Sequence, residues 1–144
     1  DLRRELILAG AVHGRAGDLG AGLYSQENVS AVYDEVLRRA HTWLRAGHSV
    51  IVDGTWRDGR NRQRAYTVAA ESYSPVVELM CTLPIGEASQ RILNRGASSS
   101  DATPSIAAEL SAWAAEWPSA HRLDTARPIA DSVAEAQRLC LLAV

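Results

Sequence analysis

Apolar side chains recur at helical spacing over much of this chain. Residues 2–8 alternate apolar and charged positions as a short amphipathic helix does. Ser25 is placed to cap a second helix, and Gly47 is placed to end it. The apolar positions between them lie three or four residues apart and predict one buried face: Val29, Val32, Val36, Ala40, Trp43 and Leu44.

Other segments predict further helices and three short strands. The remaining helices are predicted at about 60–72, 86–95, 104–117 and 131–142, and the strands at 49–53, 76–82 and 121–125. The first two strands are rich in β-branched and apolar residues, as buried parallel strands are. Because helices alternate with strands, we expect an α/β fold, a parallel sheet flanked by helices. No repeat or boundary interrupts the pattern, so one domain over residues 1–144 is expected.

Composition narrows the possible partners. The chain has 144 residues, and its net charge of −2 provides no basic field for nucleic acid or an anionic membrane. No apolar run approaches the roughly 20 residues that cross a bilayer, and nothing resembles a signal peptide, so a cytoplasmic protein is expected. Cys81 and Cys140 stand in apolar stretches and are expected to be reduced, buried thiols.

Asp53 is the first candidate for chemistry, because it closes the predicted strand at 49–53. Ligands bind at the carboxyl ends of strands in open parallel sheets. A carboxylate there can hold magnesium through water or position a reacting hydroxyl. A turn or helix-capping role, helped by Gly54 and Thr55, explains the same residue equally well.

Arginines form the second candidate group. Four of them follow Asp53 within eight residues, and guanidinium groups match phosphate oxygens well; they are Arg57, Arg60, Arg62 and Arg64. Arg91 and Arg95 lie four apart on a predicted helix that breaks at Gly96, the arrangement of a phosphate-clamping lid. A solvated helix face for the first group, and a pair favourable to the helix dipole for the second, remain alternatives.

Taken in their order along the chain, the motifs of this sequence resemble those of P-loop kinases of the polynucleotide-kinase/zeta-toxin-like (AAA-type ATP-binding) family. Residues 1–4 (DLRR) resemble the Asp-x-x-Arg that follows the second strand of those enzymes. The resemblance implies that Asp1 is the general base and that Arg4 holds the acceptor. Residues 50–55 (VIVDGT) resemble the third-strand motif, whose aspartate lies near the acceptor and the metal.

The resemblance extends to the helices that follow. Arg62 and Arg64 fall where the family has an acceptor-side arginine, and residues 87–96 resemble the lid helix. The implied residues are Asp1, Asp53 and Arg95 for catalysis, Arg4, Arg62, Arg64 and Thr55 for the acceptor, Arg91 and Arg95 for ATP, and Asp53 for Mg²⁺.

One part of the family's pattern is missing from these 144 residues. The first strand and the glycine-rich loop with its Lys-Ser/Thr should precede Asp1, in a unit of roughly 30 or more residues. All 15 basic residues are arginine, so no lysine can replace the one in that loop. The chain is therefore expected to be the acceptor-site and lid portion, with an upstream P-loop segment as its partner. Residues 22–47 particularly resemble a P-loop domain that follows an aminoglycoside-phosphotransferase-like domain in some bacterial proteins, so a fused kinase-like domain is a second expected partner.

These expectations together describe an ATP-dependent phosphotransferase that uses Mg²⁺ and moves the γ-phosphoryl group to a hydroxyl of a small molecule or nucleotide. A sugar, an antibiotic, a nucleoside and a polynucleotide 5′ end all suit such a site, although the weak net charge disfavours long nucleic acid. Two alternatives stay open: a degenerate kinase fold that only binds an anion or nucleotide, and a structural domain that regulates a neighbour.

Overall fold

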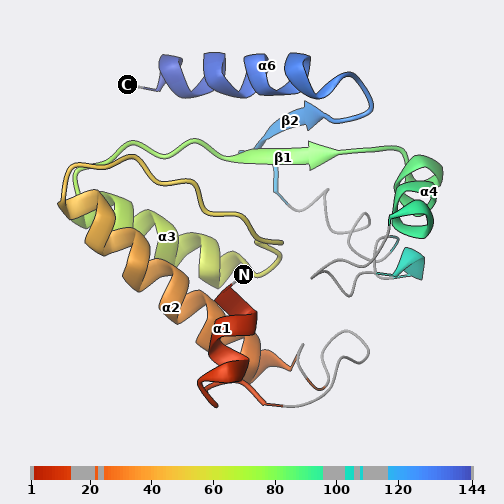
Figure 1. Ribbon diagram of the computed structural model, residues 1–144. Coiled ribbons are helices and arrows are strands. Elements are labelled where there is room, and N and C mark those ends of the chain that lie inside the picture. The colour runs from red at the N-terminus through yellow and green to blue at the C-terminus, as the bar shows by residue number, and fades with distance from the viewer. Residues whose placement is uncertain are drawn as a thin grey trace. The chain divides into compact units, whose positions relative to one another are not determined.

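The computed structural model describes residues 2–13, 22, 25–95, 103–105, 108 and 117–143. The chain divides into two compact units, Asp1–Ser74 and Pro75–Val144, whose elements are labelled in Figure 1. The single domain expected over residues 1–144 stays a prediction.

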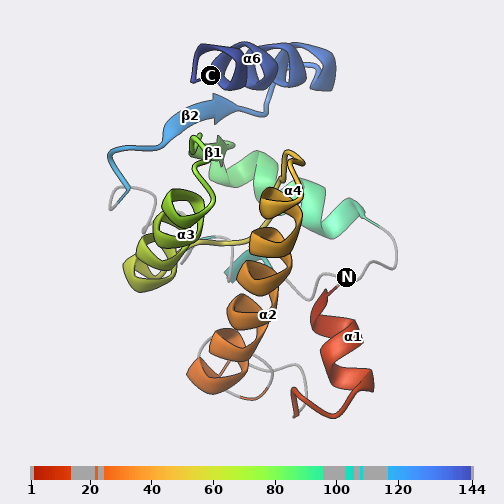
Figure 2. The same ribbon diagram turned by 90° about the vertical axis from the view of Figure 1, so that its left-hand side faces the viewer.

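The first unit is helical. It contains α1 (Leu2–Leu8), α2 (Gln26–Arg45) and α3 (Gly59–Glu71), and α2 lies between the other two (Figure 2). Ser25 caps α2 as predicted, since its side chain accepts a hydrogen bond from the amide of Asn28 at 3.4 Å. Gly47, at φ +83°, follows the last turn of α2 in the left-handed conformation that glycine adopts easily.

The buried face of α2 differs from the predicted one. Tyr33, Leu37 and Ala40 are its buried residues, whereas Trp43 keeps 56% of its surface exposed. Tyr33 and Leu37 are one turn apart, so the buried stripe still follows helical spacing. The sequence interpretation missed it because it assigned the valines, rather than Tyr33 and Leu37, to the core.

The predicted strand at 49–53 was wrong. Residues 48–53 carry no strand assignment, and Ile51 in the middle of them is 97% exposed. A strand exists only when a neighbouring strand completes its backbone hydrogen bonds, and no described residue pairs with this segment. The apolar run is present, but its β-structure depends on a partner strand.

The second unit contains the sheet. Its elements are β1 (Leu79–Thr82), α4 (Ile85–Asn94), β2 (His121–Asp124) and α6 (Ile129–Leu142). The strands pair in parallel, with Leu79 opposite His121 and Thr82 opposite Asp124, which confirms a parallel α/β arrangement for this unit. Leu123 is buried, and α6 packs along β2 (Figure 1).

Several smaller expectations have mixed outcomes. The strands are shorter than the predicted 76–82 and 121–125, and the helix expected at 104–117 lies mostly outside the described residues. Cys81 and Cys140 are free, as predicted, but both are exposed rather than buried, because the described chain leaves their faces of β1 and α6 uncovered. Among the described helices, none is long and apolar enough to cross a membrane.

Candidate functional site

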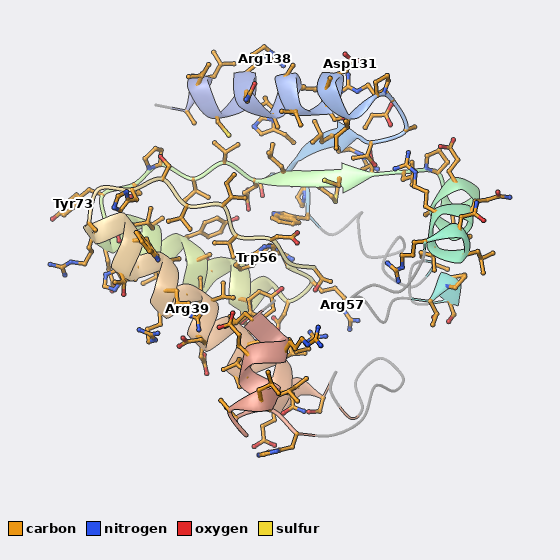
Figure 3. The ribbon with its side chains drawn as sticks, viewed as in Figure 1. Arg39, Trp56, Arg57, Tyr73, Asp131 and Arg138 are labelled. Atoms are coloured by element: carbon orange, nitrogen blue, oxygen red, sulfur yellow. The ribbon has the colours of Figure 1, made fainter. Side chains whose placement is uncertain are left out.

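The first unit presents its candidate chemistry on the connection between α2 and α3, at residues 53–58, called here the 53–58 loop. Asp53 and Thr55 are exposed in it, and Trp56 and Arg57 are half-buried (Figure 3). Among the described residues, none donates a hydrogen bond to the Asp53 carboxylate. An exposed carboxylate to which no described residue donates can bind a cation or accept a proton.

Tyr33 holds the 53–58 loop from α2. Its hydroxyl oxygen accepts a hydrogen bond from the backbone amide of Trp56 at 2.9 Å. The two rings meet edge to face, with centroids 4.9 Å apart and planes at 61°. The indole N–H of Trp56 donates to the carbonyl of Val52 at 3.3 Å, which closes the turn that contains Asp53.

Arg62 holds the same loop from α3. Its Nη1 donates to the carbonyl of Trp56 at 2.6 Å and to that of Arg57 at 3.1 Å. The sequence assigned Arg62 to the acceptor; the structure shows that this guanidinium already supports the loop on which Asp53 and Thr55 lie.

The backbone of Trp56 is strained. Its φ of +48° is rare for a bulky aromatic residue and costs on the order of 1–3 kcal/mol. Gly54 lies close by, where an added Cβ would come within 3.1 Å of the Tyr33 hydroxyl oxygen and 3.5 Å of the Trp56 indole nitrogen. A glycine therefore lets the loop approach the two aromatic rings.

The other arginines of α3 are engaged in local contacts. Arg64 forms an ion pair with Asp34 of α2 and donates to the side-chain oxygen of Asn61 at 3.2 Å. Arg60 pairs with Asp58, the residue that caps α3, and this hydrogen bond lowers the pKa of the Asp58 carboxyl. Arg64 thus joins α2 to α3, and Arg60 stabilises the first turn of α3.

Of the two predicted residues at the start of the chain, Arg4 is described and lies apart from α3. Arg4 is on α1, on the other side of α2 from α3 (Figure 2). Asp1 lies outside the described residues. Asp53 and Thr55 therefore lie on the 53–58 loop, and Arg62 lies on α3, which supports that loop. Arg4 lies on a separate helix.

In the second unit, α4 carries the predicted lid residues. The Nη2 of Arg91 donates to the carbonyl of Thr125, just after β2, at 2.9 Å. Arg91 also lines an open hollow of about 530 Å³ at the start of α4, together with Pro84, Gly86, Glu87 and Gln90.

Arg91 and Arg95 stay one helical turn apart at the end of α4, because the amide of Arg95 donates to the carbonyl of Arg91 at 3.0 Å. The helix ends at Asn94, one residue earlier than expected, and Arg95 has extended backbone angles of −75° and 138°. The φ of Arg95 and this hydrogen bond keep its Cβ at the helical position four residues after Arg91, and only the chain beyond Arg95 leaves the helix. Arg95 is exposed at the C-terminal end of α4.

Sequence reasoning missed Tyr33 and Thr125 as residues that support the candidate site. Tyr33 lay outside the predicted apolar stripe of α2, so nothing in the sequence marked its hydroxyl as a contact to the 53–58 loop. Thr125 follows β2, and both its amide and its hydroxyl donate to the carbonyl of Thr82 at 2.9 Å. A polar residue directly after a parallel strand was the only available signal.

The family resemblance implies Mg²⁺, and the described residues fit it in a limited way. No group of three metal-binding side chains occurs in the parts of the chain that the structure describes. Magnesium, however, is usually held by one or two carboxylates with waters and substrate phosphates. Asp53, exposed and without a donor in the described chain, is suited to that role.

Comparison with known proteins gives the class. A model of the AAA domain family matches residues 3–117, so the chain belongs to this family, which has the P-loop, nucleotide-binding, kinase-like plan. The matched range includes the 53–58 loop and α4.

Among curated proteins, three mycobacterial sequences are similar to this chain. One is an uncharacterized protein of Mycobacterium bovis, and two are uncharacterized proteins of Mycobacterium tuberculosis strains. Each is 45% identical over 139 residues, which is 96% of this chain. The chain spans only 28% of the length of these relatives. No solved structure gives a significant match.

Proposed function

We propose that this chain is the acceptor-site and lid portion of an ATP-dependent phosphotransferase, which moves the γ-phosphoryl group of ATP to a hydroxyl of a small molecule or nucleotide. The observation that carries the proposal is the AAA domain match over residues 3–117, because it covers both the 53–58 loop and the lid helix α4. The phosphate-binding loop that the reaction needs is supplied by sequence outside these 144 residues.

Within this proposal the first unit serves the acceptor. Asp1 accepts the proton of the attacking hydroxyl, and Arg4 holds the acceptor. Asp53 holds Mg²⁺ through water, and bound Mg²⁺ neutralises charge on the phosphates. Thr55 contacts the acceptor from the same loop, while Arg62 and Arg64 act through the loop and the α2–α3 contact that they support.

The second unit serves the nucleotide. Arg95, exposed at the end of α4, contacts the transferring phosphate, where a charge-assisted hydrogen bond is strongest in the transition state. Arg91 lies one turn earlier and is anchored on the carbonyl of Thr125. Besides its proposed contact with ATP, Arg91 supports the lid helix α4, while Arg95 reaches the phosphates.

The test is phosphotransfer by the complete protein that carries this chain, measured as ATP-dependent transfer of labelled phosphate to a panel of hydroxyl compounds. Asp1→Asn should lower kcat by about 10²–10⁴-fold and keep most of the ATP affinity, because it removes a general base. Arg95→Ala should lower the rate by an amount equivalent to about 2–4 kcal/mol.

Two exposed residues of α6 provide matched controls for these variants. Asp131→Asn and Arg138→Ala make the same chemical changes on a helix without a proposed catalytic role (Figure 3). Both should keep full activity, and all four variants should keep the melting temperature. If the Asp1 and Arg95 variants stay fully active, the site assignment is wrong. If nucleotide binds and no acceptor is phosphorylated, the protein is the non-catalytic nucleotide-binding module instead.

A further inference from the structure

Trp56 is the residue on which the contacts of the 53–58 loop converge. Its amide donates to the hydroxyl oxygen of Tyr33, and its carbonyl accepts from Nη1 of Arg62. The amide and the carbonyl of one residue are therefore each fixed by a side chain from a different helix. This arrangement fixes both backbone angles of Trp56, including its disfavoured φ of +48°.

The indole of Trp56 extends this arrangement back to Val52. Its N–H donates to the Val52 carbonyl at 3.3 Å, so the segment from Val52 to Trp56 is closed into a turn. Asp53 and Thr55 lie inside that turn. The indole hydrogen bond to Val52 fixes the start of the turn, and the contacts of the Trp56 backbone with Tyr33 and Arg62 fix its end. The directions of Asp53 and Thr55 therefore depend on Trp56.

Tyr33 is the more rigid partner in the contacts between α2 and the 53–58 loop. It is buried on α2 with 9% of its surface exposed, and it contacts Trp56 both through its ring and through its hydroxyl. A buried side chain on a helix of 20 residues has little freedom to follow a moving loop. The loop must therefore adapt to Tyr33.

We propose that Tyr33 is a positioning residue for Asp53: by accepting the Trp56 amide hydrogen, its hydroxyl holds the 53–58 loop in the conformation that the reaction requires. The proposal rests on the proposed phosphotransfer function. Tyr33 itself does not touch the reacting atoms. It acts through the backbone of Trp56, and Arg62 completes the same support from α3.

The closing experiment compares Tyr33→Phe with Tyr73→Phe in the complete protein. Tyr33→Phe keeps the aromatic ring and removes only the acceptor oxygen. Tyr73, 97% exposed beyond the end of α3, loses the same atom without touching the loop (Figure 3). Hydrogen exchange, read by mass spectrometry on peptides covering residues 53–58, should be about two- to tenfold faster in Tyr33→Phe and unchanged in Tyr73→Phe.

The kinetic arm distinguishes positioning from a purely structural role. Tyr33→Phe should lower kcat by about tenfold or more, because small misplacements of a catalytic group are costly, while KM for ATP stays the same and the protein stays folded at the assay temperature. Unchanged exchange, or faster exchange with unchanged kcat, overturns the proposal. A wild-type protein that transfers no phosphate refutes the proposed function and, with it, the role of Tyr33 in positioning Asp53 for the reaction. The exchange arm then still reports whether Tyr33 fixes the loop.

Discussion

Glu35 on α2 is the centre of a small ion-pair network. Its carboxylate accepts hydrogen bonds from Arg38 at 2.6 and 2.7 Å and from Arg39 at 2.8 Å. Arg39 also donates to Glu5 of α1 at 2.9 Å, so the network joins α1 to α2. The hydrogen bonds from Arg38 and Arg39 lower the pKa of Glu35 from 4.5 to about 2.

This shift predicts a pH dependence of stability. Because the folded-state pKa is depressed, the contribution of Glu35 is present above pH 4.5 and is lost as the pH falls toward about 2. The contribution is small, since the network is largely exposed. Glu35→Gln should lower the urea midpoint at pH 6, and the difference from wild type should shrink between pH 4.5 and 2.

The control for that measurement is Glu71→Gln, at the end of α3 and outside the network. It should show no such convergence with wild type. A Glu35→Gln protein whose urea midpoint matches wild type at every pH would mean that the network adds nothing to the folded state.

At the scale of elements, local sequence signals predicted the helices well and the strands poorly. Caps and stops such as Ser25 and Gly47 act within one turn, so the bounds of α2 could be predicted from its own residues. The apolar run at 49–53 needs hydrogen bonds from another strand, and the sequence shows only the run.

The candidate site shows the same division. The sequence predicted that Asp53 and Thr55 would be available for chemistry, and the structure leaves both exposed. It did not predict that Tyr33 and Arg62 would fix the loop, since those contacts join residues that are 23 and 6 positions from Trp56. Contacts of this kind depend on how α2 and α3 flank the loop, which periodicity does not reveal.

The end of β2 provides a prediction about how elements are joined in the second unit. Ser132, buried in the first turn of α6, donates through its hydroxyl to the carbonyl of Asp124 at 2.9 Å. Ser132→Ala should therefore destabilise the β2–α6 connection by about 1 kcal/mol, which is typical of one lost hydrogen bond. Hydrogen exchange of peptides spanning residues 121–132 should become faster.

Ser119→Ala is the matched control, because Ser119 is exposed in the turn before β2. Its exchange should equal that of wild type. If both serine variants exchange alike, the hydroxyl of Ser132 does not hold α6 on β2.

At the scale of the whole molecule, the two units account for the acceptor side and the lid of the proposed enzyme, and neither contains a glycine-rich loop followed by lysine. In P-loop proteins the backbone amides of that loop and its lysine make most of the contacts to the nucleotide phosphates. We therefore expect the 144-residue chain to bind ATP–Mg²⁺ weakly or not at all. Adding the preceding segment of the complete protein, where it encodes such a loop, should tighten binding strongly. Calorimetric titration of both proteins with ATP–Mg²⁺ measures the difference in affinity. An Arg95→Ala variant of the longer protein measures how much of that protein's ATP affinity depends on Arg95. Tight binding by the 144-residue chain alone would show that its arginines are sufficient to hold the phosphates, and the dependence on a separate P-loop would then be wrong.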